Sequence, residues 1–238
     1  MAQSMYRTLR IPTSRIGLLS GLLAIAVNLV IPAPAPAASD NSAPKWKVWT
    51  YNPSNRAFKG SVPAKDAPNA IATFPFPVAP DTALLITDHG SYKGTLLGDL
   101  TGKTISATVS TAGGPFTYYG ANTPSNPCPG TATVRFYFQT KSPASFSETD
   151  YWWSNPVSLP LNGLTNNPTP MSVSLNPANW SDYFGHFGAD PTYLAAFNAA
   201  VKDVTSIGFS FGGGCFFENG VGAPTGGSFT LRSFSVAP

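Results

Sequence analysis

Alternation of apolar and polar residues is the dominant pattern of this chain, and it predicts β-strands. The clearest case is the segment 131–139, where Ala132, Val134, Phe136 and Phe138 alternate with Thr133, Arg135, Tyr137 and Gln139. Successive side chains of a strand point to opposite faces, so the first set is expected in the core and the second on the outside. The same pattern predicts strands at 45–51, 104–110, 171–175, 206–211 and 228–236, and Leu84 to Ile86 form a short apolar segment.

Three local patterns refine these strands. In 45–51 the sequence leaves two choices open, with either Trp46 and Val48 or Lys47, Trp49 and Tyr51 facing the core. The adjacent Trp152 and Trp153 must point to opposite faces of a strand. In the last strand the apolar set changes parity between Leu231 and Phe234, which predicts a β-bulge near Arg232 and Ser233.

One segment has a helical period. Asp190 can cap a helix with Pro191 in its first turn, and the apolar residues Leu194, Phe197, Val201 and Val204 then fall on one face. The pattern switches to alternation at Ile207, which predicts a strand with one buried face directly after the helix.

These elements predict an all-β fold, a jelly-roll-like β-sandwich of about 8–10 strands with one short crossover helix at about 190–204. Residues 81–238 are expected to form the sandwich. Residues 38–80 form a Pro-rich, irregular segment with one strand, and belong to the same domain. No charged or low-complexity linker divides the chain.

Residues 1–37 have the pattern of a secretory signal peptide. Three arginines precede an apolar run at 16–31, and small residues follow in APAPAPAAS. We expect cleavage after Ala37, with Ala38 as the alternative. An uncleaved membrane anchor is the competing interpretation, but the run falls short of the ~20 apolar residues that a span needs. The mature chain is therefore expected to be secreted, extracellular or periplasmic, and free of the membrane.

Removing this segment changes the charge. Arg7, Arg10 and Arg15 are lost with no acid, so Lys plus Arg falls from 14 to 11, equal to the 11 Asp plus Glu. The sequence pI of about 8.9 is thus a property of the precursor. A neutral mature chain gives no support for nucleic-acid binding.

Cys128 and Cys215 are the only cysteines, and in an exported chain they predict one disulfide bond between distant loops. Two free thiols, or a metal site formed together with His186, are the alternatives.

A resemblance to a known family follows from the order of the elements. GSYKGTLLGDLTGKTISATV is followed by an aromatic strand, then PVSLPL, MSVSL and ANW, a helix ending in VKDVTSIGFSF, and the strand SFTLRSFSV. This order resembles the laminin B (domain IV) type module and, more loosely, the galactose-binding-like jelly rolls, over about 91–236. The final strand departs from the family, which tends to have an Asp-Asn pair where this chain has Leu231 to Phe234. The resemblance implies an extracellular, non-catalytic module.

Aromatic residues are the best candidates for ligand binding. Flat rings stack on sugars, and neighbouring polar side chains bond to hydroxyl groups. The partner is expected to be an extracellular glycan or a matrix or cell-surface component. Of the residues before the helix, 180–187 are the most favoured to contact it. The predicted binding residues are Trp152, Trp153, Tyr118, Tyr119, Trp180 and Tyr183.

Two other functions remain open at this point. A polysaccharide hydrolase would use Glu148 and Asp150, which lie on one side if that segment is extended. A structural or adhesive surface protein would use strand edges and apolar faces. No GxSxG motif accompanies His89 or His186, so no catalytic residue is predicted.

No cofactor is predicted except a possible structural Ca²⁺. Asp88, Asp99 and the glycine-rich loop between them could supply some of the six or so oxygen ligands that this ion needs. His186 with Asp182 is the other pair of candidate metal ligands.

Overall fold

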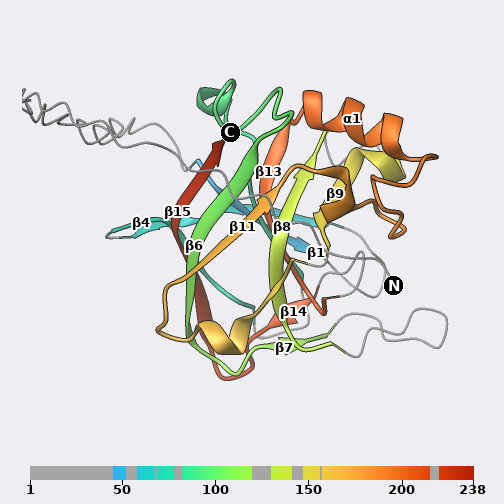
Figure 1. Cartoon of the computed structure of the whole chain (residues 1–238). Helices are drawn as coiled ribbons and strands as arrows, with labels where there is room; N and C mark the ends of the chain where they lie inside the picture. Colours follow the sequence, from blue (N-terminus) through green and yellow to red (C-terminus); the bar gives the residue numbers. More distant parts are fainter. Residues whose placement is uncertain are drawn as a thin grey trace, which may run out of the picture. The chain divides into compact units, whose positions relative to one another are not determined.

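Two antiparallel β-sheets lie face to face and enclose the main hydrophobic core (Figure 1). The computed structural model describes residues 45–51, 58–67, 69–77, 82–119, 130–140, 147–155, 157–214 and 220–238, all within the compact unit Ser42–Pro238. The predicted all-β sandwich with one short helix is confirmed. The predicted signal segment, residues 1–37, lies outside the described residues.

The larger sheet has the strand order β12-β9-β8-β13-β5-β1-β2, and β10 also pairs with β8. Its strands are β1 (Lys47–Tyr51), β2 (Phe58–Pro63), β5 (Thr82–Thr87), β8 (Thr133–Gln139), β9 (Tyr151–Ser154), β10 (Leu159–Pro160), β12 (Trp180–Ser181) and β13 (Ser206–Gly212).

The smaller sheet has the order β11-β6-β15-β4-β3, and a separate two-stranded sheet joins β14 to β7. These strands are β3 (Lys65–Ala67), β4 (Ala70–Pro75), β6 (Thr104–Gly113), β7 (Thr117–Tyr118), β11 (Thr169–Ser174), β14 (Val221–Gly222) and β15 (Gly227–Ala237). Four short 3₁₀ turns are also described: η1 (Gly90–Tyr92), η2 (Glu148–Asp150), η3 (Leu161–Leu164) and η4 (Pro177–Asn179).

The segment before residue 80 contributes more to the sheets than its sequence predicts. Only one strand is expected in 38–80, yet β1 to β4 all lie there. β1 is an internal strand of the larger sheet, paired with β2 and β5. Prolines do not prevent this, because Pro63 and Pro75 lie at the ends of their strands.

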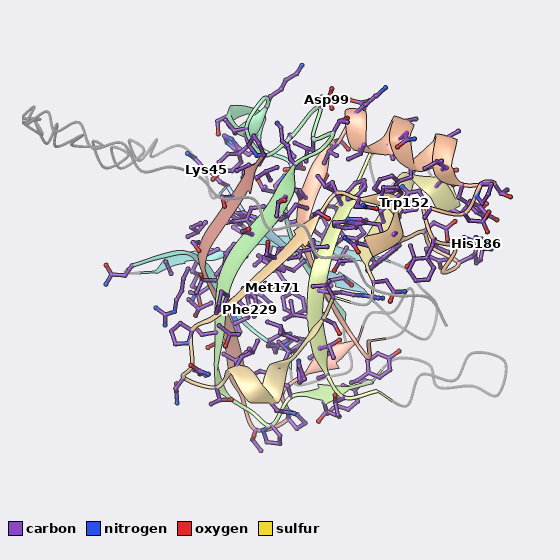
Figure 2. All side chains as sticks on the ribbon, in the orientation of Figure 1. Lys45, Asp99, Trp152, Met171, His186 and Phe229 are labelled. Carbon is purple, nitrogen blue, oxygen red and sulfur yellow. The ribbon has the colours of Figure 1, made fainter. Side chains whose placement is uncertain are left out.

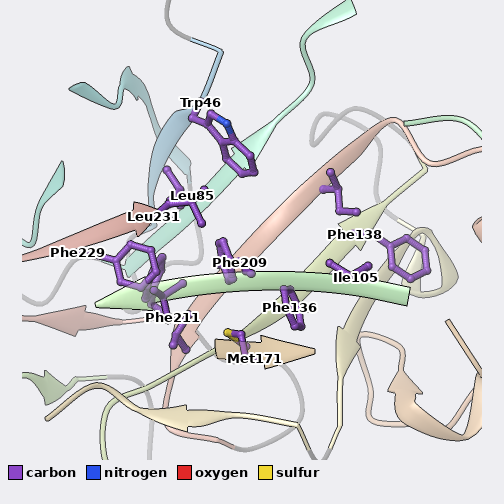
Figure 3. Close-up of a cluster of buried hydrophobic side chains, with 14 of the residues drawn as sticks. Trp46, Leu85, Ile105, Phe136, Phe138, Met171, Phe209, Phe211, Phe229 and Leu231 are labelled. Carbon is purple, nitrogen blue, oxygen red and sulfur yellow. The ribbon is translucent and has the colours of Figure 1, made fainter. Parts of the chain in front are cut away.

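The core lies between the inner faces of the two sheets (Figure 3). Phe136 of β8 and Phe209 of β13 stack with ring centroids 5.4 Å apart. Phe209 also meets Phe229 of β15, from the opposite sheet, in an edge-to-face contact of 5.7 Å. The apolar sets of the predicted strands are therefore buried as expected, including Ile105, Ala107 and Val109 of β6.

The open choices of strand orientation are now settled. Trp46 and Val48 join the main core, whereas Trp49 packs on the other side of the sheet. Trp152 and Trp153 point to opposite faces, as predicted. The pairing of β15 with β6 shifts between Leu231 and Ser233, which confirms the predicted bulge.

The outer face of the larger sheet is buried, contrary to expectation. Arg135, Tyr137, Gln139 and Ser210 are all at most 2% exposed. A second group of large side chains covers this face, and we call it the outer aromatic cluster: Leu84, Ile86, Tyr137, Tyr151 and Trp153, with Trp49 and Tyr183 packed against it. In β13, Gly208 and Ser210 alternate with apolar residues, so the sequence predicts that only the apolar face of this strand is buried. The sequence pattern of β13 alone does not show that large side chains of neighbouring strands cover Gly208 and Ser210.

The helix α1 (Leu194–Lys202) starts later than predicted. Asp190 caps the preceding turn instead, because its Oδ1 accepts a hydrogen bond from the Thr192 N–H at 2.9 Å. Phe197 and Val201 are buried as expected, but Leu194 is 37% exposed. The helix connects β12 to β13 across the larger sheet, which confirms the crossover. Within the described ranges, no helix has the length and apolar character required to cross a membrane.

Both cysteines lie outside the described residues, so the disulfide stays a prediction. Their described neighbours are in close contact, since a Cβ built on Gly130 would fall 1.5 Å from the Gly213 carbonyl oxygen. We therefore expect the oxidised protein to show no free thiol under denaturing conditions, and two after reduction. Free thiols titrating before reduction would contradict the Cys128–Cys215 bond.

Candidate functional site

Exposed apolar side chains gather at the loop that connects β12 to α1. This loop, residues 182–193, is called here the β12–α1 loop. Among the described residues the large exposed apolar side chains are Val62, Phe184 (52%), Phe187 (40%) and Leu194 (37%). Three of these four belong to the loop or to the first residue of the helix. This concentration of exposed apolar side chains marks a candidate binding site.

A buried carboxylate fixes the conformation of the loop. Asp182 is fully buried, and its Oδ1 accepts hydrogen bonds from the backbone N–H groups of Phe184 and His186, each at 2.9 Å. Its Oδ2 lies 3.0 Å from His186 Nδ1. The backbone N–H of Asp182 also donates to the His186 carbonyl at 2.9 Å. A single side chain thus closes the turn and orients the imidazole.

Further contacts attach the loop to the sandwich. Phe187 forms an isolated β-bridge with Ser181, and the Gly188 N–H donates to the Trp180 carbonyl at 2.9 Å. Gly188 lies so close to α1 that an added Cβ would come within 2.8 Å of the Phe197 ring. The loop is therefore held in a fixed position at the end of the sandwich where α1 and β9 lie. Figure 2 shows His186 at the periphery of the molecule.

The rings of the loop form a continuous series. His186 and Tyr193 are stacked face to face, with centroids 4.2 Å apart and an interplanar angle of 7°. The ring centroid of Phe184 lies 6.3 Å from that of His186 and 5.2 Å from that of Tyr183. Tyr183 in turn meets Trp153 of the outer aromatic cluster at 6.2 Å. The rings of the loop are therefore connected, through Tyr183 and Trp153, to the buried outer aromatic cluster of the larger sheet.

Carboxylates border these rings. The pKa of Tyr193 is raised above its ordinary value, first by partial burial of the ring and then by the negative charges of Glu148, Asp182 and Asp190. Glu148 belongs to η2, and its carbonyl accepts a hydrogen bond from the Tyr183 N–H at 3.4 Å. Aromatic faces beside carboxylates suit a polar ligand with an apolar face, such as a sugar ring.

Three of the predicted binding residues are internal, which corrects the sequence-based expectation. Trp152 and Trp180 have no exposed area, and their indole N–H groups donate to the carbonyls of Thr149 and Ser174 at 2.8 and 2.9 Å. Trp153 is 3% exposed and belongs to the outer aromatic cluster. None of the three rings presents a face to solvent, so Trp152, Trp153 and Trp180 are not available to stack on a ligand at the surface.

The predicted tyrosines lie in two separate places. Tyr183 is half-buried within the β12–α1 loop. Tyr118 belongs to β7 and Tyr119 directly follows it, and Figure 1 places β7 and β14 at the end of the sandwich away from α1. The structure therefore keeps Tyr118 and Tyr119 apart from Tyr183.

The hydrolase hypothesis loses its geometric basis. Glu148 and Asp150 would share one side of an extended segment, but they form the 3₁₀ turn η2. A 3₁₀ helix turns by about 120° per residue, so side chains two residues apart diverge. Asp150 is also 8% exposed, with its Oδ1 accepting from the Thr140 hydroxyl at 3.3 Å.

The candidate calcium ligands have other partners. Asp88 forms an ion pair with Lys47 at 2.9 Å. Asp99 is exposed, and hydrogen bonds from Thr101 lower its pKa. Within the described ranges, no group of three or more His, Cys, Asp or Glu could hold a metal ion. The alternative metal site with His186 involves Cys128 and Cys215, which are not described.

The residues that build the site were only partly foreseen. Segment 180–187 was favoured as the contact region, and Phe184 and His186 are within it. Tyr193 was missed, because its role depends on a turn that stacks it on a residue seven positions earlier. An Asp followed by glycine and aromatic residues, as in DYFGHF, is the signal that could have identified the closed turn.

Comparison with protein-family models, with characterised proteins and with solved structures found no match. The resemblance to the laminin B (domain IV) module accordingly stays a prediction.

Proposed function

We propose that this chain is a secreted, extracellular or periplasmic, non-catalytic β-sandwich module that binds a glycan through the β12–α1 loop. The observation that carries the proposal is the cluster of exposed Phe184 and Phe187 beside the stacked pair of His186 and Tyr193. Secretion is supported by the pattern of residues 1–37, and the 3₁₀ turn formed by Glu148 and Asp150 argues against the hydrolase that would use this pair.

The arrangement suits a sugar better than a purely apolar partner. Pyranose rings have an apolar face that packs on aromatic rings and hydroxyl groups that bond to carboxylates and imidazole. The site offers both, since Phe184 lies next to His186 and carboxylates border Tyr193. The loop is preformed by Asp182, so binding requires little ordering of the protein.

We expect Phe184→Ala and Phe187→Ala each to weaken glycan binding about tenfold, the equivalent of about 1.4 kcal/mol. A glycan array identifies the ligand, and titration calorimetry with that ligand measures the loss. Val62→Ala is the matched control, because Val62 is 58% exposed on β2, outside the site.

Circular dichroism should show that all three variants remain folded. Glycan binding that is unchanged in both phenylalanine variants would reject the loop as the site. Binding of a matrix protein but no glycan would replace the proposal by an adhesive function.

A further inference from the structure

The chain carries no positive side chain over a long segment around the candidate site. Between Lys141 and Lys202 the sequence contains Glu148, Asp150, Asp182 and Asp190, but no lysine or arginine. This segment includes η2, β9, β12, the β12–α1 loop and nearly all of α1. The charge of a neutral mature chain is therefore distributed unevenly, with the acidic part at the binding loop.

Among the described residues, His186 is the one ion-pair partner of the acids at the loop. Asp182 pairs only with His186, and among the described residues no lysine or arginine forms an ion pair with Glu148 or Asp190. Arg135 of the outer face is 2% exposed and does not reach the surface. The raised pKa of Tyr193, caused first by partial burial and then by Glu148, Asp182 and Asp190, agrees with a negative potential at the rings.

Among the described residues, no lysine or arginine lies over the rings of Phe184, His186 or Tyr193. In the described part of the chain, the cation–ring contact is that of Lys45 with Tyr92, at 5.6 Å, which involves no residue of the β12–α1 loop. Exposed rings beside unpaired carboxylates attract an ammonium group in two ways, through the ring quadrupole and through direct charge. Uronate and sulfate groups would be repelled for the same reason.

We infer that the glycan taken by the β12–α1 loop carries protonated amines, as in a glucosamine polymer. The inference rests on the proposed glycan-binding function and adds the charge class of the ligand. Phe184 and the stacked pair of His186 and Tyr193 contact the sugar rings, and Glu148 and Asp190 attract the amines. Asp182 is a positioning residue, since its carboxylate is used inside the turn.

The test compares two oligosaccharides of equal length, a glucosamine oligomer and its N-acetylated counterpart, at a pH at which the free amines are protonated. We expect the wild-type protein to bind the glucosamine oligomer at least about fivefold more tightly. Glu148→Gln and Asp190→Asn should each reduce that preference about threefold or more, and raised salt should reduce it as well.

Asp190→Asn retains an oxygen that accepts from Thr192, so the loop is preserved. Asp99→Asn is the control, because it removes an exposed carboxylate that also accepts from a nearby backbone N–H, but outside the site. A preference that survives in both site variants would overturn the inference.

The outcomes separate the inference from the proposed function. Equal binding of the two oligomers, or binding only of neutral or acidic glycans, would overturn the charge class and leave glycan binding intact. Binding of no glycan at all by the wild-type protein would remove the proposed function and the inference together.

Discussion

Replacing Asp182 by alanine should both destabilise the protein and abolish binding by the β12–α1 loop. The substitution leaves the N–H groups of Phe184 and His186 and the His186 Nδ1 without their acceptor. Losing hydrogen bonds to a buried charged group costs about 3 kcal/mol, because the donors lose their partner inside the protein. For a chain of this size that corresponds to a fall in melting temperature of about 10 °C.

Asp182→Asn is the matched variant for this prediction. An asparagine retains an oxygen for the two backbone donors and changes only the partner of His186. We expect it to recover most of the stability and to show whether the orientation of His186 matters for binding. Calorimetric melting and glycan titration of the three proteins provide the measurements. Equal melting temperatures for wild type and Asp182→Ala would show that the loop does not depend on this carboxylate.

Gly208→Ala should have the largest effect on folding. Gly208 lies in β13 between β5 and β8, opposite Ile86 and Tyr137. A Cβ at this position would fall 2.1 Å from the Leu85 carbonyl oxygen and 2.9 Å from the Ile86 Cα. Both atoms belong to the backbone of a central strand, so the sheet itself would have to move. We expect a loss of at least about 3 kcal/mol in the free energy of unfolding.

Gly163→Ala is the control for Gly208→Ala, since a Cβ on Gly163 would have no atom within 4 Å. Urea unfolding of both variants measures the difference. A Gly208→Ala protein that fails to accumulate in folded form while Gly163→Ala folds normally is the extreme form of the expected result. A midpoint equal to that of wild type would mean that β13 and β5 can separate at little cost.

Alternation predicted the inner faces of the strands well, because burial in one core requires a period of two. Val134, Phe136 and Phe138, the two orientations of Trp152 and Trp153, and the bulge after Leu231 all follow from this rule. The outer face of the larger sheet could not be predicted in the same way. Residues such as Arg135 and Gln139 are polar, and their burial depends on rings contributed by distant strands.

The candidate site overlaps the segment 180–187 that the sequence favours, but its exposed residues are not the expected ones. The predicted binding residues include three tryptophans, but a large indole ring also contributes strongly to a core when it is buried. Trp152 and Trp180 accordingly fill the core, and the exposed positions belong to Phe184 and Phe187. The segment 38–80 holds more strands than its proline content predicts, because Pro63 and Pro75 lie at strand ends and do not interrupt the pairing.

The way in which Asp182 closes its turn has a consequence for how specificity can change. The hydrogen bonds from Phe184 and His186 to the Asp182 Oδ1 come from their backbone N–H groups, so the side chain of Phe184 takes no part in these hydrogen bonds. Its identity can therefore be altered while the turn persists. If the loop binds a ligand as proposed, residue 184 is therefore a position at which specificity can change, by natural mutation or by selection from a library, while the backbone hydrogen bonds to Asp182 are kept.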